Sequence, residues 1–194
     1  GHRFTQEVHQ SVDAQKEPAL KELLVQERLN ATACPQCRSQ VVLSAPILYH
    51  DASRSVFALF MPMGIAQSDV QQQQLVGSMT NRFMASLQPE ERRGYMLQPR
   101  MFLTLQSLVD DILMGDGLTR EQIDARRQRT VLLEQLLSSQ TMEALQGAID
   151  ANMEQFDDAF FDVLDGWIAQ AESADDQETF TALSALRQEI SAAV

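Results

Sequence analysis

The apolar residues of this 194-residue chain change their spacing once, at Met61-Pro62-Met63-Gly64. Before this breaker, apolar residues alternate with polar ones or form short runs such as Val41-Val42-Leu43, as in β-strands. After it, they recur every three or four positions, which is typical of amphipathic helices. We therefore predict an α+β protein with a small β module over residues 1–63 and an all-helical bundle over residues 64–194.

The pattern before the breaker predicts several strands and one helix. Phe4, Val8 and Val12 alternate with polar residues and indicate a first strand. Pro18 is well placed in the first turn of a short helix running from Ala19 to about Arg28, because proline lacks an N–H that would be unpaired there. Further strands are expected over residues 40–43, 48–50 and 56–61, the last two paired around the turn at 51–55.

The pattern after the breaker predicts about five helices. Ser68 is expected to cap the first, and Thr119-Arg120-Glu121-Gln122 has the sequence of a capping box. A helix from Met101 to Ile112 is expected to end at the glycines that follow it. The longest pattern runs from Leu145 to Ala171, more than seven turns, and Ser173 is expected to cap a last helix.

Cys34-Pro35-Gln36-Cys37 contains the only two cysteines of the chain. Two intervening residues allow both thiolates to bind one tetrahedral zinc ion. A closed structural site needs four ligands, so a zinc bound by Cys34 and Cys37 would need two further cysteines from outside this chain. Iron is a less favoured occupant, although the same four thiolates bind it as well.

Two other interpretations of the cysteine pair remain open. Cys34 and Cys37 would form a thiol–disulfide pair if they lay at the start of a helix, which lowers a thiol pKa. The residues after Cys37 indicate a strand instead. The other interpretation is that Cys34 and Cys37 are an inert remnant of a zinc knuckle, the turn in which two cysteines bind one zinc ion. In either case, two cysteines in one motif suit a reducing cytoplasm.

An ordered set of residues around the knuckle is similar to that of the bacterial CpXC-domain proteins. It comprises Gly1-His2-Arg3-Phe4, the stretch from Glu17 to Leu24, Leu29-Asn30, the knuckle itself, and Ala45-Pro46-Ile47-Leu48-Tyr49-His50-Asp51. The resemblance covers residues 1 to about 62 and implies a zinc-ribbon-like fold without implying an activity. The chain departs from the family in lacking a first Cys-Pro-X-Cys and in having Arg38 where a glycine is common.

The chain has three histidines, which are candidate metal ligands. His9 is expected to be exposed, on the face opposite Phe4 and Val8. His50 lies just before a turn, where a hydrogen-bonded structural role is favoured over metal binding or catalysis. His2 is the third candidate, and no spacing supports a two-cysteine, two-histidine site.

The net charge of −12 is concentrated in the C-terminal part, where residues 120–194 hold fifteen acidic and five basic side chains. Such a segment repels nucleic acids and anionic membranes. We therefore expect neither as a partner. Six acidic residues form a stripe that we interpret as a solvated helix face, with a metal-binding or basic-partner surface as the alternative: Asp150, Glu154, Asp157, Asp158, Asp162 and Asp165.

The C-terminal aromatic residues Phe156, Phe160, Phe161 and Trp167 are interpreted as core. Phe160 and Phe161 are adjacent, so the apolar stripe is wide enough for two neighbouring helices, or for one helix and another subunit. No catalytic or phosphate-binding motif is present. We expect a non-enzymatic, cytoplasmic zinc-ribbon scaffold whose partner is a protein or a second copy. The alternative is a thiol-redox or electron-transfer protein that uses Cys34 and Cys37.

Overall fold

The computed structural model describes residues 2–37, 40–65, 68–139, 141–173 and 176–193. It confirms an α+β protein. The chain forms two compact units, residues 1–117 and residues 118–194. The division therefore lies after Gly117, whereas the change of periodicity had indicated a boundary after Met63. The two differ because the first helices after Met63 pack against the strands.

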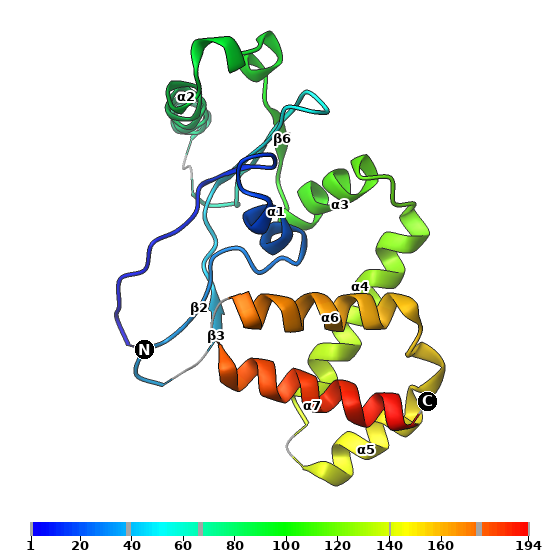
Figure 1. The fold of residues 1–194 in the computed structure, drawn as a ribbon. Coiled ribbons are helices and arrows are strands. Elements are labelled where there is room, and N and C mark those ends of the chain that lie inside the picture. Colours follow the sequence, from blue (N-terminus) through cyan, green and yellow to red (C-terminus); the bar gives the residue numbers. More distant parts are fainter. Residues whose placement is uncertain (1, 38–39, 66–67, 140, 174–175, 194) are drawn as a thin grey trace. The chain divides into compact units, whose positions relative to one another are not determined.

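The N-terminal unit contains a four-stranded mixed sheet in the order β1-β4-β5-β6. Figure 1 labels β6, the last strand of this sheet. Its strands are β1 (Ser11–Asp13), β4 (Ile47–Asp51), β5 (Val56–Phe60) and β6 (Arg100–Phe102). β4 and β5 are antiparallel, as predicted, and the two outer strands are parallel to their neighbours. Two predictions were wrong: Phe4 and Val8 precede β1 and lie outside it, and Met101 belongs to β6, not to a helix.

Helices cover both faces of this sheet. On one face, Leu48, Phe57 and Leu59 form a core with Met79 and Phe83 of α2 (Asp69–Ser86). On the other, α1 (Pro18–Val25) contacts β1, and α3 (Leu105–Gly115) contacts β5. Every residue of β4 is buried, because a central strand covered on both sides has no solvated face.

Two 3₁₀ turns connect α2 to β6, η1 (Pro89–Glu91) and η2 (Gly94–Leu97). The remaining strands, β2 (Ala31–Ala33) and β3 (Gln40–Val42), form a separate antiparallel hairpin. The predicted strand at 40–43 is thereby confirmed. Arg38 lies outside the described residues.

The described part of the C-terminal unit contains helices and no strand. It consists of α4 (Arg120–Leu137), α5 (Met142–Ala151), the 3₁₀ turn η3 (Met153–Gln155), α6 (Asp158–Ser173) and α7 (Gln177–Ala193). Phe160, Leu164 and Leu183 are completely buried in its core. Thr119 and Gln122 form the predicted capping box at the start of α4, and Ser68 caps α2 as predicted.

The prediction of one seven-turn helix from Leu145 to Ala171 is wrong, because the helix ends at Ala151 and a second one begins at Asp158. The side-chain amide of Asn152 donates through its nitrogen to the Ala148 carbonyl and accepts through its oxygen from the Gln155 side chain. These two bonds fix the turn between α5 and α6. Ser173 is the last residue of α6 and does not cap α7. Asp176 does so, by accepting from the Thr179 amide.

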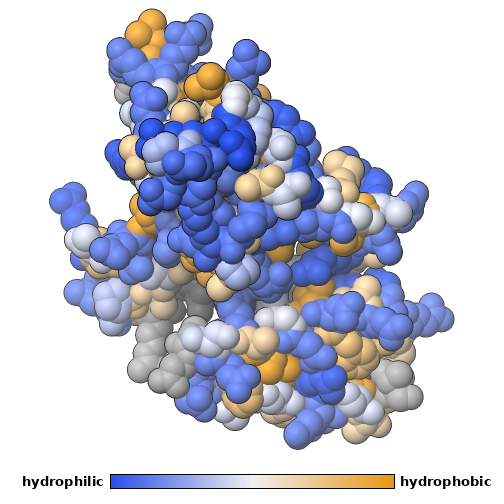
Figure 2. Space-filling model, turned by 45° about the horizontal axis from the view of Figure 1, so that its top comes forward, coloured by the Kyte–Doolittle hydropathy of each residue, from blue (hydrophilic) through white to orange (hydrophobic). Residues whose placement is uncertain are grey.

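Most of the surface seen in Figure 2 is hydrophilic, with small apolar patches between polar side chains. No described helix combines the length and the hydropathy that crossing a bilayer requires.

Candidate metal centre and buried polar clusters

Cys34 and Cys37 lie in the turn that joins β2 to β3. Cys34 directly follows β2 and is buried, with 6% of its surface exposed, whereas Cys37 is exposed at the end of the turn. Both are free thiols. No helix begins at Cys34, so the helix N-terminus that lowers the thiol pKa in many redox motifs is missing here.

The start of the chain lies beside this hairpin (Figure 1). The His9 amide donates to the Asn30 side chain over 2.7 Å, and the Asn30 amide group donates to the His9 carbonyl over 3.0 Å. Asn30 has a positive φ of 65°, which asparagine tolerates better than most residues. This paired contact fixes the N-terminal segment against the base of the hairpin.

As a result, His2 comes close to the knuckle. Its Nδ1 atom lies 3.6 Å from the Cys34 sulfur, and the ligand atoms of His2, Cys34 and Cys37 all lie within 4.8 Å of one another. In a tetrahedral zinc site, such atoms are about 3.5–3.8 Å apart. One nitrogen and two sulfurs at this spacing fit zinc after small side-chain adjustments. Sequence spacing alone did not indicate His2.

The other two histidines have no place in this group. His9 is exposed, as expected, although it precedes β1 and its exposure has nothing to do with strand alternation. His50 is buried on the α2 face of β4, where its ring contacts the rings of Phe57 and Phe83. The predicted hydrogen-bonded role of His50 is confirmed by the contacts described next.

His50 is the middle member of a chain of three side chains. Its Nδ1 lies 3.0 Å from the Asp13 carboxylate, and its Nε2 lies 2.9 Å from the Tyr95 hydroxyl. Because a carboxylate only accepts, Nδ1 carries the hydrogen towards Asp13, and Nε2 is left to accept a hydrogen bond from the Tyr95 hydroxyl when it carries none. The donors follow the order of a catalytic hydroxyl–histidine–aspartate triad. However, burial raises the pKa of Tyr95, which is the opposite of what activates a hydroxyl.

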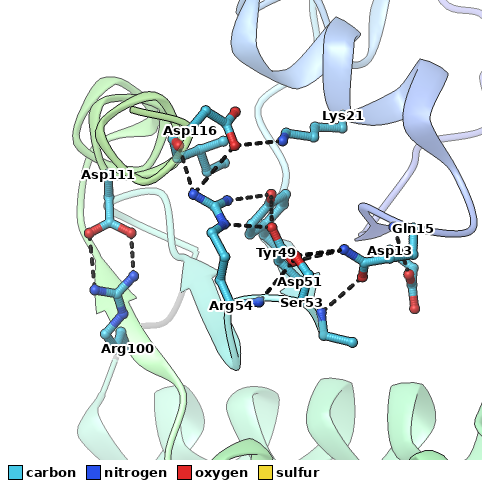
Figure 3. Close-up of polar contacts among 12 residues, drawn as sticks. Asp13, Gln15, Lys21, Tyr49, Asp51, Ser53, Arg54, Arg100, Asp111 and Asp116 are labelled. Carbon is cyan, nitrogen blue, oxygen red and sulfur yellow. Dashed lines mark hydrogen bonds and ion pairs between the residues drawn. The ribbon is translucent and has the colours of Figure 1, made fainter. Parts of the chain in front are cut away.

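A second polar cluster lies on the other face of the sheet, towards α1 and α3 (Figure 3). The Arg54 guanidinium donates to Asp51 over 2.7 Å, to the Tyr49 hydroxyl over 3.1 Å and to the Ile112 carbonyl over 3.1 Å. It also lies 3.4 Å from Asp116, which pairs with Lys21. This cluster connects the β4–β5 turn to the C-terminal end of α3.

The carboxylate of Asp51 is fully satisfied within this cluster. Burial by itself would raise its pKa, but hydrogen bonds from Ser53, Gln15 and Arg54 outweigh burial and hold the pKa well below its usual range. Burial raises the pKa of Tyr49 above its ordinary value. The neighbouring Arg100–Asp111 pair links β6 to α3 in the same way. The sequence indicated the turn at 51–55 but not the role of Arg54.

The acidic stripe is not a continuous helix face. Asp150 belongs to α5 and Glu154 to η3, so neither continues the face of α6. Asp157 caps α6 by accepting from the Phe160 amide and pairs with Arg129. Asp165 pairs with Arg187 of α7.

The aromatic residues of α6 belong to the core, as predicted. Phe160 is completely buried and makes edge contacts with Phe156 and Phe161. Both α4 and α7 pack on α6. The Arg187 guanidinium lies over the Phe161 ring, 5.6 Å from its centre. The wide apolar stripe is therefore covered within the unit, so it gives no argument for a second subunit.

A family model described as CpXC protein matches residues 1–127, which is more than half of the chain. No curated protein and no solved structure matches this chain.

Proposed function

The chain belongs to the CpXC protein family, and we propose that it is a non-enzymatic scaffold whose N-terminal unit binds a structural zinc ion through Cys34 and Cys37. The observation that carries this proposal is the grouping of the two thiols with the His2 ring, all within 4.8 Å. The ion would close the β2–β3 turn and attach the start of the chain to it. In a longer chain, two further cysteines would complete the site, and His2 would then be a neighbour of the metal.

Chemistry supports zinc over other occupants. Two thiolates and an imidazole are the ligands of structural zinc sites, and no carboxylate belongs to this group of residues. Zinc would contribute folding energy directly, because the separate hairpin has only three residues in each strand. Free thiols in this motif also fit a reducing cytoplasm.

Cobalt titration of the purified chain tests the proposal, because Co²⁺ replaces zinc and its thiolate complexes absorb visible light. We expect one Co²⁺ per chain, displaced by zinc. Cys34→Ser and Cys37→Ser should each abolish the thiolate absorption, and His2→Ala should weaken binding about 10-fold or more. His9→Ala is the matched control, because His9 is exposed and lies outside the group.

Other results of the same titration would overturn the assignment. Equal cobalt affinity in the Cys34→Ser variant would remove the knuckle as the site. Iron in the protein as purified, or a disulfide between Cys34 and Cys37 that forms and reduces reversibly by mass spectrometry, would favour the thiol-redox function instead.

The C-terminal unit is proposed to supply a surface for a protein partner. Its ten-charge excess of acidic over basic side chains disfavours nucleic acid and favours a basic partner. Isothermal titration against a DNA duplex should give no salt-sensitive binding by this unit.

A further inference from the structure

A hollow of about 240 Å³ opens between the end of α4, the start of α5 and one side of α7. It is lined mainly by apolar side chains: Leu136, Leu137, Met142, Leu145, Ala182, Ala185 and Leu186, with Ser139 and Glu189. Small-molecule pockets usually measure about 300–1,000 Å³. This hollow is smaller, and its size suits one or two apolar side chains of a protein partner.

The hollow exists because α7 presents small residues where its neighbours present large ones. Ala182 and Ala185 lie one turn apart and are exposed, with Leu186 buried beside them. On the opposite side, Met142 is 69% exposed and Leu137 is 41% exposed. Methionine adapts its shape to different partners, so it is common at surfaces that bind helices.

The charge around the hollow is negative. Glu189 lines it, and Glu143 follows Met142 on α5. After Thr130 the sequence has a single basic residue, Arg187, and that side chain already pairs with Asp165. A second copy of this unit would bring the same excess of acidic charge, so the field disfavours self-association through this surface.

We propose that this hollow binds an apolar anchor side chain of a basic amphipathic helix supplied by a partner protein. The apolar walls receive the anchor, and the acidic surroundings attract lysine and arginine residues on the flanks of the same helix. Binding of a helix in an apolar groove uses anchors spaced three or four residues apart. This inference rests on the proposed partner-binding role of the C-terminal unit and is independent of zinc binding at Cys34 and Cys37.

The test uses the whole chain and a fluorescent synthetic helix made of leucine and lysine with one apolar face. Fluorescence anisotropy is expected to show micromolar binding that weakens as salt increases. A scrambled peptide of the same composition and a leucine–glutamate helix should bind at least 10-fold more weakly. The cobalt titration at the knuckle should be unchanged, so a failure here is distinct from a failure of the zinc proposal.

Ala182→Phe fills the hollow and is expected to reduce peptide affinity at least 10-fold. Ala151→Phe is the matched control, since Ala151 is an exposed helix residue outside the lining. Circular dichroism of both variants establishes that the unit still folds. Unchanged binding to Ala182→Phe, equal binding of the scrambled peptide, or no binding at millimolar peptide would each overturn the proposal. Sedimentation showing a dimer that Ala182→Phe dissociates would assign the hollow to a second copy.

Discussion

Replacing Gly115 by alanine is expected to destabilise the N-terminal unit, although this change usually stabilises a helix. Gly115 is the last residue of α3, and a β-carbon built on it collides with the Arg54 guanidinium. The guanidinium is the far end of the flexible Arg54 side chain, so it can move. Moving it, however, breaks the contacts with Asp51, Tyr49 and the Ile112 carbonyl.

The magnitude follows from these contacts. Alanine in place of glycine gains about 0.5–1 kcal/mol in a helix interior, and less at its end. A hydrogen bond to a charged group contributes about 1.5–3 kcal/mol. Displacing Arg54 also weakens the pairing of the buried Asp51 carboxylate. We therefore expect Gly115→Ala to lower the free energy of unfolding by about 1–3 kcal/mol.

Gly77→Ala is the matched control. Gly77 lies inside α2 of the same unit, and nothing lies within 4 Å of a β-carbon built there. This variant is expected to gain about 0.5–1 kcal/mol. The two substitutions are chemically identical, so opposite signs would isolate the contact with Arg54.

Urea unfolding can follow the two units separately. The only tyrosines, Tyr49 and Tyr95, belong to the N-terminal unit, and the only tryptophan, Trp167, belongs to the C-terminal unit. Near-ultraviolet tyrosine signals should shift in Gly115→Ala while Trp167 fluorescence does not. In an Arg54→Met background the added cost of Gly115→Ala should vanish. A cost that persists in that background, or a Gly115→Ala variant as stable as Gly77→Ala, would refute the collision argument.

Three further predictions concern the core, the tyrosines and nucleic acid. Phe160→Ala should cost about 3–5 kcal/mol in urea melts followed by Trp167 fluorescence, because Phe160 is completely buried; a shift near zero would contradict that burial. Burial raises the pKa values of Tyr49 and Tyr95, so their contribution to stability is complete below about pH 10 and is lost as pH rises from there through the folded-state values. Absorbance titration should show less tyrosinate in the folded chain than in urea at the same pH. Gel-shift assays with DNA or RNA should show no complex; a complex formed through the acidic residues 118–194 would contradict the electrostatic argument.

The predictions that held rest on short-range chemistry. Ser68 and Thr119 were found as caps because a capping side chain bonds to an amide within three residues of itself. The β4–β5 pair was found because its two apolar runs flank a short turn. In both cases the partners are close together in the sequence.

The prediction of one helix from Leu145 to Ala171 failed for a different reason. Ile149 and Phe156 are seven residues apart, so the apolar pattern stays in phase across the break. The break itself depends on polar side chains, namely the bonds of Asn152 and the attachment of Asp157 to Arg129 on α4. The spacing of apolar residues does not depend on such polar contacts, so it does not indicate the break. The predicted boundary between the units was misplaced for a related reason, because periodicity does not indicate which helices pack on strands.

The candidate sites show the same limit on a larger scale. The spacing of Cys34 and Cys37 was visible because two zinc ligands can be local, but His2 is 32 residues from Cys34. The position of His2 depends on the paired contact between His9 and Asn30, and no sequence motif indicates that contact. The same pairing makes a specific demand on the zinc proposal: Asn30→Ala should weaken metal binding as His2→Ala does, although Asn30 supplies no ligand. If Asn30→Ala binds cobalt as tightly as the unchanged chain while His2→Ala does not, the chain start reaches the knuckle without help from the hairpin base.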